Sequence, residues 1–540
     1  MGVKPGARIQ RAAKEVFGFD HLRPGQAEAV EQVLEGRDTL AVMSTGYGKS
    51  AIYQIAAMLI PGPTVVVSPL IALQRDQVGE LEREGAGGAA AVSSFVAEGA
   101  RREALEELAE GALEFLFLSP EQLSNGEVLA DVAAARPSLF VVDEAHCISE
   151  WGHDFRPDYL KLGAVAEAVG RPPVLALTAT ASPPVRAEIV ERLGMRTPEV
   201  IVRGFDRPNI WLGVERFHSE RAKRQALLER VAGEPKPGIV YAATRRLAEE
   251  LAAELGSRGV SALAYHGGMQ RRERVEAQEG FMGDAVDVVV ATTAFGMGVD
   301  KPNVRFVFHS EPADSVDSYY QEIGRGGREG EPARALLFFR SEDLGLRRFF
   351  AGGGNVDADE IRLVAETVAA GEPLTEAELS QTKLATAVTR LEDVGGVAVL
   401  ASGEVVARRV ADDLDAVVDA AWREQEDRQQ FDRSRVEMMG AYAESSGCRR
   451  EFVLTYFGER FSPPCGNCDN CLAGRVGEEA GSRPFAEGAR VAHQRWGEGT
   501  VQRYEEGAVV VLFESVGYKK LGVDIVLERG LLASVDGLPR

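Results

Sequence analysis

Residues 40–60 read LAVMSTGYGKSAIYQIAAMLI, and this stretch decides the fold of the amino-terminal part of the chain. Its apolar start predicts a buried strand and its apolar end predicts a helix. The turn TGYGKS between them would point backbone N–H groups at an anion, where the helix dipole favours phosphate. Lys49 is expected to reach the β- and γ-phosphates of a nucleotide, and Ser50 is expected to hold Mg²⁺.

Two carboxylates after another apolar run complete the chemistry of this site. The full phosphate-loop pattern has glycine where this chain has Met43, so the turn alone leaves a purely structural role open. In VVDEAH (141–146), Asp143 and Glu144 follow a predicted strand, at the edge where open α/β sheets bind ligands. Asp143 can hold the metal through water, and Glu144 can orient or deprotonate the attacking water. With Lys49, the pair predicts a nucleoside-triphosphate hydrolase rather than an acidic cap on a strand.

Short apolar runs alternate with helical patterns throughout the first 345 residues. The runs are residues 64–68, 114–119, 138–143 and 174–180, followed by 238–244, 261–266, 287–293 and 304–310. Strands that alternate with helices predict a parallel sheet covered on both faces. We therefore expect an α/β fold with two such sheets, one on each side of residue 205.

Length and composition narrow the class of protein. The chain has 540 residues, which at roughly 150 residues per domain predicts three or four domains. Lys and Arg number 61 against 83 Asp and Glu, and the net charge of −22 excludes a uniformly basic coat for nucleic acid but not a local basic channel. Because there is no apolar run of about 18 residues and no signal-peptide pattern, we expect a cytoplasmic protein.

The region from residue 351 to 425 has a different character. Helical patterns at 357–370, 374–380 and 381–395 precede a hairpin pattern at 396–409 with Ser-Gly at its turn. Three helices and a hairpin predict a winged-helix-like insert. Such modules contact duplex DNA or only other proteins, and the acidic composition of this one argues against a general grip on duplex DNA.

Four of the five cysteines are close together in the sequence: Cys448, Cys465, Cys468 and Cys471. The two-residue gaps let successive thiolates bind one ion, and Cys448 would complete a tetrahedral site. The spacing predicts a closed structural metal site, for which zinc and an iron–sulfur cluster are both open. Cys147, outside the cluster, is expected to be a small buried residue.

The motifs resemble those of superfamily two helicases. The string DEAH (143–146), the triplet TAT (178–180) and the element QEIGRGGR (321–328) all match that pattern. The resemblance implies two RecA-like lobes that sandwich ATP, with arginines of the second lobe stabilising charge on the γ-phosphate. It adds to Lys49, Asp143 and Glu144 the catalytic candidates Gln321, Arg325 and Arg328.

Further stretches narrow the resemblance to the RecQ family of DNA helicases. Residues 17–26 (FGFDHLRPGQ) are similar to the adenine-reading element of that family, and residues 147–159 (CISEWGHDFRPDY) are similar to its aromatic-rich loop. Residues 205–210 (FDRPNI) and 291–302 (ATTAFGMGVDKP) also match. The chain departs from the family at Glu150, where Gln is commoner, and at Gly326, where Ala is commoner.

The resemblance implies ligands for particular residues. Nucleotide contacts are expected from Arg23, Gln26, Thr45, Gly46, Gly48, Lys49, Ser50 and Asp300, and magnesium contacts from Ser50 and Asp143. Trp151, Phe155 and Arg156 are expected to contact single-stranded DNA, because aromatic faces stack on bases and arginine can stack or meet phosphate. The residues around Cys448 and Cys465 resemble the RecQ zinc subdomain, which favours zinc over an iron–sulfur cluster.

In residues 485–540, apolar and polar side chains alternate as in β-strands, which predicts a small barrel. The stretch from Gly488 to Leu521 resembles the Tudor-like barrel of UvrD/PcrA-type helicases, which implies contact with RNA polymerase or another protein. A barrel that only packs against the helicase body is the alternative. In common RecQ proteins a winged helix follows the zinc subdomain, whereas here the winged-helix-like segment precedes the cysteines.

The resemblance implies an ATP- and Mg²⁺-dependent DNA helicase that moves 3′ to 5′ on single-stranded DNA and acts in repair and recombination. As a DNA helicase, the protein is expected to be associated with the nucleoid. An RNA helicase and an ATP-switched scaffold that does not unwind are the alternatives. The expected domains are the first lobe at 1–205, the second lobe at 206–350, the insert with a linker helix at 351–425, the zinc subdomain at 426–475 and the barrel at 485–540.

Overall fold

The structure is a computed structural model of the whole chain. It describes residues 5–69, 71–93, 96, 98–149, 156–296, 301–351, 356–374, 379–399, 405–476, 483–505, 507–513 and 515–535. The chain divides into two compact units. The first unit comprises Met1–Arg340 and Ser445–Gly477, and the second comprises Ser341–Glu444 and Glu478–Arg540.

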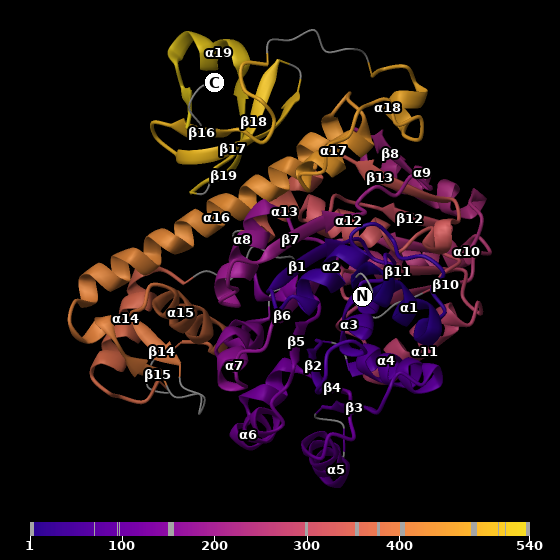
Figure 1. Cartoon of the computed structure of the whole chain (residues 1–540). Helices are drawn as coiled ribbons and strands as arrows, with labels where there is room; N and C mark the ends of the chain where they lie inside the picture. Colours follow the sequence, from indigo (N-terminus) through magenta and orange to yellow (C-terminus); the bar gives the residue numbers. More distant parts are fainter. Residues whose placement is uncertain are drawn as a thin grey trace. The chain divides into compact units, whose positions relative to one another are not determined.

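The first lobe is a seven-stranded parallel sheet in the order β3-β4-β2-β5-β6-β1-β7 (Figure 1). Its strands are β1 (Thr39–Met43), β2 (Thr64–Val67), β3 (Ala89–Val92), β4 (Phe115–Leu118), β5 (Leu139–Val142), β6 (Val174–Thr178) and β7 (Glu199–Arg203). Its helices are α1 (Pro5–Phe17), α2 (Gln26–Leu34), α3 (Ser50–Ala57), α4 (Ile71–Glu84), α5 (Glu98–Ala109), α6 (Gly126–Ala134), α7 (Leu162–Ala168) and α8 (Pro183–Arg192), with 3₁₀ turns at Pro120–Ser124, Ala145–Ile148 and Pro157–Lys161. The central strands are buried along their whole length, because helices cover both faces of a parallel sheet.

The second lobe is a six-stranded parallel sheet in the order β10-β11-β9-β12-β13-β8. Its strands are β8 (Ile210–Arg216), β9 (Gly238–Tyr241), β10 (Ala262–Tyr265), β11 (Val288–Ala291), β12 (Phe306–His309) and β13 (Ala333–Phe339). Its helices are α9 (Glu220–Gly233), α10 (Arg245–Ser257), α11 (Arg271–Met282) and α12 (Val316–Ile323), with a 3₁₀ turn at Arg328–Gly330. The predicted pair of parallel sheets is therefore confirmed.

The cysteine-rich segment belongs to the same unit as the two lobes. It contains α17 (Arg449–Tyr456) and α18 (Asp469–Leu472). The N–H of Leu212 donates to the carbonyl of Asn467 (3.3 Å), and Leu212 pairs with Cys468 in a parallel bridge. The segment therefore extends the second sheet along the outer edge of β8.

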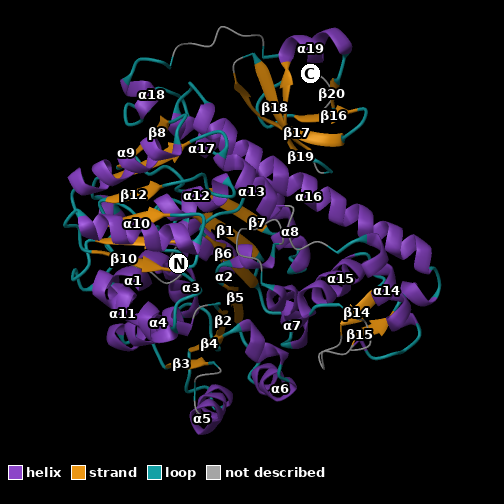
Figure 2. Ribbon diagram, turned by 180° about the vertical axis from the view of Figure 1, so that it is seen from behind, coloured by secondary structure: helices purple, strands orange, loops and turns teal. Residues whose placement is uncertain are grey.

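The second unit is built along the long helix α16 (Leu414–Glu444). Helices α13 (Asp343–Ala351), α14 (Ala358–Ala369) and α15 (Gln381–Asp393) pack on it, and the hairpin of β14 (Val397–Val399) and β15 (Val405–Ala407) lies beside α14 and α15 (Figure 2). A 3₁₀ turn at Arg409–Ala411 leads into α16. Two of the three predicted helices of the insert and the paired strands of its hairpin are thus present. Most of the helix predicted at 374–380, and the Ser-Gly turn, lie outside the described residues.

The carboxyl-terminal β-domain is a five-stranded antiparallel sheet in the order β19-β18-β17-β16-β20. Its elements are β16 (Arg490–His493), β17 (Gly497–Glu505), β18 (Ala508–Phe513), β19 (Gly517–Gly522), α19 (Val523–Arg529) and β20 (Leu532–Ser534). It packs on α16, where the N–H of Tyr518 donates to Ser434 Oγ (3.1 Å). Among the described residues, no helix of either unit is long and apolar enough to cross a membrane.

Candidate ATP site and metal centre

The phosphate loop connects the carboxyl end of β1 to the start of α3. Gly46 (φ +76°) and Gly48 (φ +81°) adopt the left-handed conformation that glycine tolerates best. Met43, which stands in the place of the usual first glycine, is the buried last residue of β1, and its carbonyl accepts a hydrogen bond from Lys49 Nζ (3.2 Å). Methionine is compatible with this loop because Met43 continues a strand and does not take part in the turn.

Residues Arg23 and Gln26, which precede and begin α2, are bonded to this loop. Gln26 Oε1 accepts from the N–H of Arg23 (2.7 Å), and Gln26 Nε2 donates to the carbonyls of Tyr47 (3.1 Å) and Gly48 (2.8 Å). The Arg23 guanidinium lies over the ring of Tyr47, 5.5 Å from its centroid. The structure therefore brings Arg23 and Gln26 to the phosphate loop, although they are more than twenty residues away from it in the sequence.

The two carboxylates lie at the carboxyl end of β5, in the same sheet edge as the loop. Burial, and then the neighbouring Glu144 carboxylate, raise the pKa of Asp143 to about 7, although Lys49 opposes this shift. Glu144 has φ +48°, an uncommon backbone conformation for a residue other than glycine. Two partly buried neighbouring carboxylates supply the oxygen ligands that suit a hard divalent cation.

A hydrogen-bonded chain connects the DEAH string to the TAT triplet. His146 Nδ1 lies 2.9 Å from Thr178 Oγ1 and 3.3 Å from Glu144 Oε2. Thr178 Oγ1 in turn donates to the carbonyl of Thr180 (3.0 Å). The interaction of His146 with Thr178 was not predicted from the sequence, although both motifs were recognised there.

The second lobe contributes a glycine-rich turn directly after α12. Arg325 in this turn is 5% exposed and lies next to Tyr241, whose pKa burial raises and Arg325 lowers. Gln321 is on α12, and Arg328 begins the following 3₁₀ turn. Arg207, in the segment between the lobes, donates hydrogen bonds to carbonyls of this turn. It also donates to the carbonyl of Thr45 in the phosphate loop (3.5 Å).

Only part of the aromatic-rich loop is described. Arg156 donates to the carbonyl of Pro69 (3.1 Å), and its N–H donates to the carbonyl of Cys147 (2.9 Å). Cys147 is fully buried, as predicted. Trp151, Phe155 and Asp300 lie outside the described residues.

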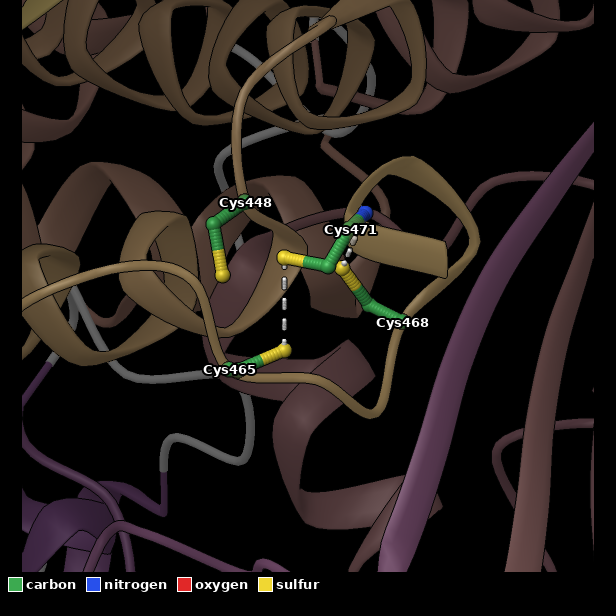
Figure 3. A group of neighbouring side chains, drawn as sticks. All are labelled: Cys448, Cys465, Cys468 and Cys471. Carbon is green, nitrogen blue, oxygen red and sulfur yellow. Dashed lines mark hydrogen bonds between the residues drawn. The ribbon is translucent and has the colours of Figure 1, made fainter. Parts of the chain in front are cut away.

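The four clustered cysteines converge on one point (Figure 3). Their sulfur atoms all lie within 4.8 Å of one another, and Cys465 Sγ and Cys471 Sγ are 3.8 Å apart. Cys448 and Cys468 are the residues that precede α17 and α18. A tetrahedron with Zn–S bonds of about 2.3 Å has sulfurs about 3.8 Å apart, so the four thiols fit a closed zinc site.

The surroundings of the cluster tie it to the second lobe. Arg449, which is 1% exposed, pairs with Asp469 (3.0 Å). Asp469 Oδ2 accepts from the N–H of Val214 in β8 (3.0 Å). The residues next to the metal ligands therefore also fix the edge of the sheet.

Family comparisons agree with this geometry. Residues 23–188 match the DEAD/DEAH box helicase family, residues 222–330 match the helicase conserved C-terminal domain, and residues 407–472 match the RecQ zinc-binding family. The chain is 36% identical over 468 residues to a Bacillus subtilis protein named probable ATP-dependent DNA helicase RecS. The matched region covers 86% of this chain and 92% of that protein. The chain belongs to the RecQ family.

Other RecQ proteins are longer than the matched region. The ATP-dependent DNA helicase RecQ of Pasteurella multocida is 36% identical over 459 residues, which cover 85% of this chain but 61% of that protein. Two solved structures share the fold. The helicase MrfA bound to DNA and AMPPNP is 20% identical, and the match covers 64% of this chain and 52% of that chain with a TM-score of 0.52. The Mycobacterium smegmatis helicase Lhr bound to single-stranded DNA and AMP-PNP is 22% identical, and the match covers 78% of this chain and 62% of that chain with a TM-score of 0.50. As a RecQ family member, the chain is a helicase with an ATP site in its first lobe and a zinc site after its second.

Proposed function

We propose that this RecQ family member is an ATP-dependent DNA helicase that moves 3′ to 5′ on single-stranded DNA, separates duplex DNA and acts in repair and recombination. The proposal is based on two structural elements that lie in the same compact unit and are both bonded by Arg207. These elements are the phosphate loop with its neighbouring carboxylates and the arginine-bearing turn of the second lobe. The relatives named as ATP-dependent DNA helicases support the choice of DNA.

In the proposed mechanism, Lys49 neutralises the β- and γ-phosphates and Glu144 orients or deprotonates the attacking water. Ser50 and Asp143 would hold Mg²⁺, which would polarise the γ-phosphoryl group. Arg325 and Arg328 would stabilise the charge that develops on that group, with Gln321 beside them. The nucleotide would be held by Arg23, Gln26, Thr45, Gly46, Gly48 and Asp300.

Coupling to DNA is assigned to the aromatic-rich loop. Trp151 and Phe155 would stack on bases, and Arg156 would contact the phosphate backbone of the DNA. The described contact of Arg156 with Pro69 supports a route from this loop to the strand end that follows β2.

Measuring ATPase activity with and without nucleic acid distinguishes a DNA helicase from an RNA helicase and from an ATP-switched scaffold. We expect hydrolysis to rise strongly with single-stranded DNA and not with RNA. Trp151→Ala should remove most of that stimulation, while Trp151→Phe, which keeps an aromatic face, should retain it. Equal stimulation by RNA would support an RNA helicase. ATPase activity without unwinding of a tailed duplex of either polarity would support an ATP-switched scaffold.

The division of labour along the chain is part of the proposal. The zinc subdomain is assigned to residues 426–475 and the two lobes to 1–205 and 206–350. The insert and its linker helix are assigned to residues 351–425. The β-domain at 485–540 would serve partner binding, with RNA polymerase or another protein as its partner. Unwinding assays on both polarities with and without residues 485–540 test this, because a protein-binding module should leave unwinding by the isolated enzyme intact.

A further inference from the structure

The segment between the two lobes contains an arginine that contacts both of them. Arg207 donates to the carbonyls of Gly324 (3.3 Å), Gly326 (3.0 Å) and Gly327 (2.9 Å), which belong to the turn that carries Arg325 and precedes Arg328. The same guanidinium reaches the carbonyl of Thr45 in the phosphate loop (3.5 Å). One side chain therefore connects the two halves of the proposed catalytic site.

The partners of Arg207 are unusual for a half-buried cation. Within the described part of the chain it forms no salt bridge, and its hydrogen bonds all end on main-chain carbonyls. Burial lowers the pKa of Arg207, and the nearby Arg328 and Arg23 lower it further. A purely structural arginine at such a place would more commonly be paired with a carboxylate. The rigid fork of a guanidinium suits the task of holding several carbonyls in a fixed arrangement.

The zinc subdomain holds the residues on the amino-terminal side of Arg207. The ring of Phe205 stacks on Phe457 with centroids 4.4 Å apart and planes inclined by 8°. The N–H of Phe205 donates to Glu459 (3.1 Å), and Asp206 pairs with Arg450 (2.5 Å). All three partners lie between Cys448 and Cys465 in the sequence, so the position of Arg207 depends on the segment that carries the metal ligands.

We propose that Arg207 is a positioning residue for ATP hydrolysis, which holds the arginine-bearing turn of the second lobe against the phosphate loop and is itself held by the zinc subdomain through Phe205 and Asp206. The inference rests on the proposed function. It concerns the geometry of Arg325 and Arg328 and requires no contact between Arg207 and the nucleotide.

The test compares Arg207→Gln and Arg207→Lys in the full chain loaded with zinc. The measurements are kcat and KM for ATP with saturating single-stranded DNA, and the affinity for a non-hydrolysable ATP analogue. Arg207→Gln should lower kcat about 10- to 100-fold, because small misplacements of catalytic groups have effects of this size. Affinity for the analogue should stay within about twofold, and Arg207→Lys should recover part of kcat.

A second variant tests the connection to the zinc subdomain. Asp206→Asn keeps the shape of the side chain but removes its charge, and it should lower kcat about 2- to 10-fold with unchanged zinc content and analogue affinity. If Arg207→Gln does not fold, the kcat of Asp206→Asn still tests whether the position of Arg207 affects ATP hydrolysis.

Three results would overturn the inference. They are a wild-type kcat in Arg207→Gln, a loss of analogue affinity that parallels the loss of kcat, and a wild-type kcat in Asp206→Asn. A wild-type chain that does not hydrolyse ATP would instead refute the proposed function, which keeps the two failures distinguishable.

Discussion

The two lobes of the first unit have the same strand order but differ in the segment that connects their first strand to the next helix. The order β3-β4-β2-β5-β6-β1 of the first lobe corresponds strand by strand to β10-β11-β9-β12-β13-β8 of the second. After β1 comes a six-residue loop with two left-handed glycines and Lys49, whereas after β8 come three residues, of which Ser219 caps α9 by accepting from the N–H of Ala222. The fold alone therefore does not make a phosphate site, because the loop decides it.

The carboxylates at corresponding strand ends differ in the same way. Asp143 and Glu144 follow β5, and Ser310 and Glu311 follow β12. Glu311 accepts from the N–H of Ala243 (3.0 Å) and from Ser310 Oγ (2.7 Å), so its charge is used within the lobe. In the first lobe, burial and Glu144 raise the pKa of Asp143 to about 7, so the charged form of this carboxyl is disfavoured unless a cation binds beside it.

The outer edges of the two sheets are covered by different structures. In the first lobe, β7 pairs with β1. In the second lobe, the loop of Asn467 and Cys468 bonds the corresponding strand β8. The cysteine site thus lies in a loop that occupies the position of a seventh strand.

The largest effect is expected from removing the metal. Cys468→Ser should abolish zinc binding and unfold the segment around α17 and α18, because a structural zinc site contributes on the order of 10 kcal/mol of binding energy to folding. Hydrogen exchange should accelerate at Leu212 and Val214 in β8 and stay slow in β1. Cys147→Ser, a buried cysteine outside the cluster, is the control and should keep its zinc. Metal analysis that finds iron, or unchanged protection of β8 in the metal-free chain, would contradict this role of the zinc site.

The next effect compares two lysines near the start of corresponding helices. Lys49→Met should lower kcat for ATP by at least about 1,000-fold, since a charge aimed at the transferring phosphoryl group is lost, with little change in folding. Lys223→Met should instead lower the free energy of unfolding by about 3 kcal/mol, because Lys223 is 2% exposed and pairs with Glu220 (3.1 Å) and Glu311 (3.8 Å). ATPase assays and denaturant titrations of both variants check this. The comparison fails if the two lysines show the same phenotype.

Most of the strands found from the sequence have strong local patterns, although the apolar run of β13 was not among the predicted strands. Valine- and phenylalanine-rich runs such as β2 and β5 were predicted, whereas β3 was not, since its sequence AAAV has low strand propensity and is half-buried. β8 was also missed, because Gly213 interrupts it. An added Cβ at Gly213 would lie 2.2 Å from the Trp211 ring, so a glycine is needed here to make room for that ring. Such a requirement at one position leaves no hydrophobic periodicity from which a strand could be predicted.

The site was predictable where its residues are neighbours in the sequence. The phosphate loop, the DEAH string and the cysteine spacing each carry their chemistry in a few consecutive residues. The contacts of Arg207 with Gly326, or of Arg186 with the carbonyl of Phe457, join residues 119 and 271 positions apart. No local signal encodes such pairs, although the FDRPNI stretch around Arg207 was recognised as part of the family pattern.

A smaller effect concerns the amino ends of the strands in the first lobe. Arg171 pairs with Asp38 (2.6 Å), and their side chains are 9% and 5% exposed. Arg171→Met should lower the free energy of unfolding by about 3 kcal/mol, because it leaves Asp38 buried without its cation. Denaturant titration measures this. Arg196→Met is the control, since its pair with Glu167 is exposed and should contribute less than about 1 kcal/mol. Equal losses in the two variants would contradict the role of burial.

The same pair predicts a pH dependence. Burial alone would raise the pKa of Asp38, but hydrogen bonds from Arg171, Arg196 and Val174 outweigh it and hold the pKa below its ordinary value of 3.8. A carboxylate with a lowered folded-state pKa stabilises the fold fully above its unfolded pKa and loses that contribution as the pH falls through the folded one. The difference in stability between the wild type and Asp38→Asn should therefore be constant near neutral pH and shrink below pH 3.8. A difference that shrinks on raising the pH would contradict this sign.

The smallest effect distinguishes two adjacent glycines in the turn of the second lobe. An added Cβ at Gly326 would meet Ala333 Cβ at 3.2 Å and Val307 Cγ2 at 3.4 Å, contacts that a small shift relieves. At Gly327 (φ +60°) it would meet Asn209 Nδ2 and the carbonyl oxygen of Glu331, both at 2.5 Å. Gly326→Ala should therefore change stability by less than about 1 kcal/mol, and Gly327→Ala should cost about 1–3 kcal/mol. Thermal unfolding and kcat of both variants test this. A Gly327→Ala protein as stable and active as Gly326→Ala would show that the turn tolerates side chains, and that its fixed shape does not set the position of Arg325.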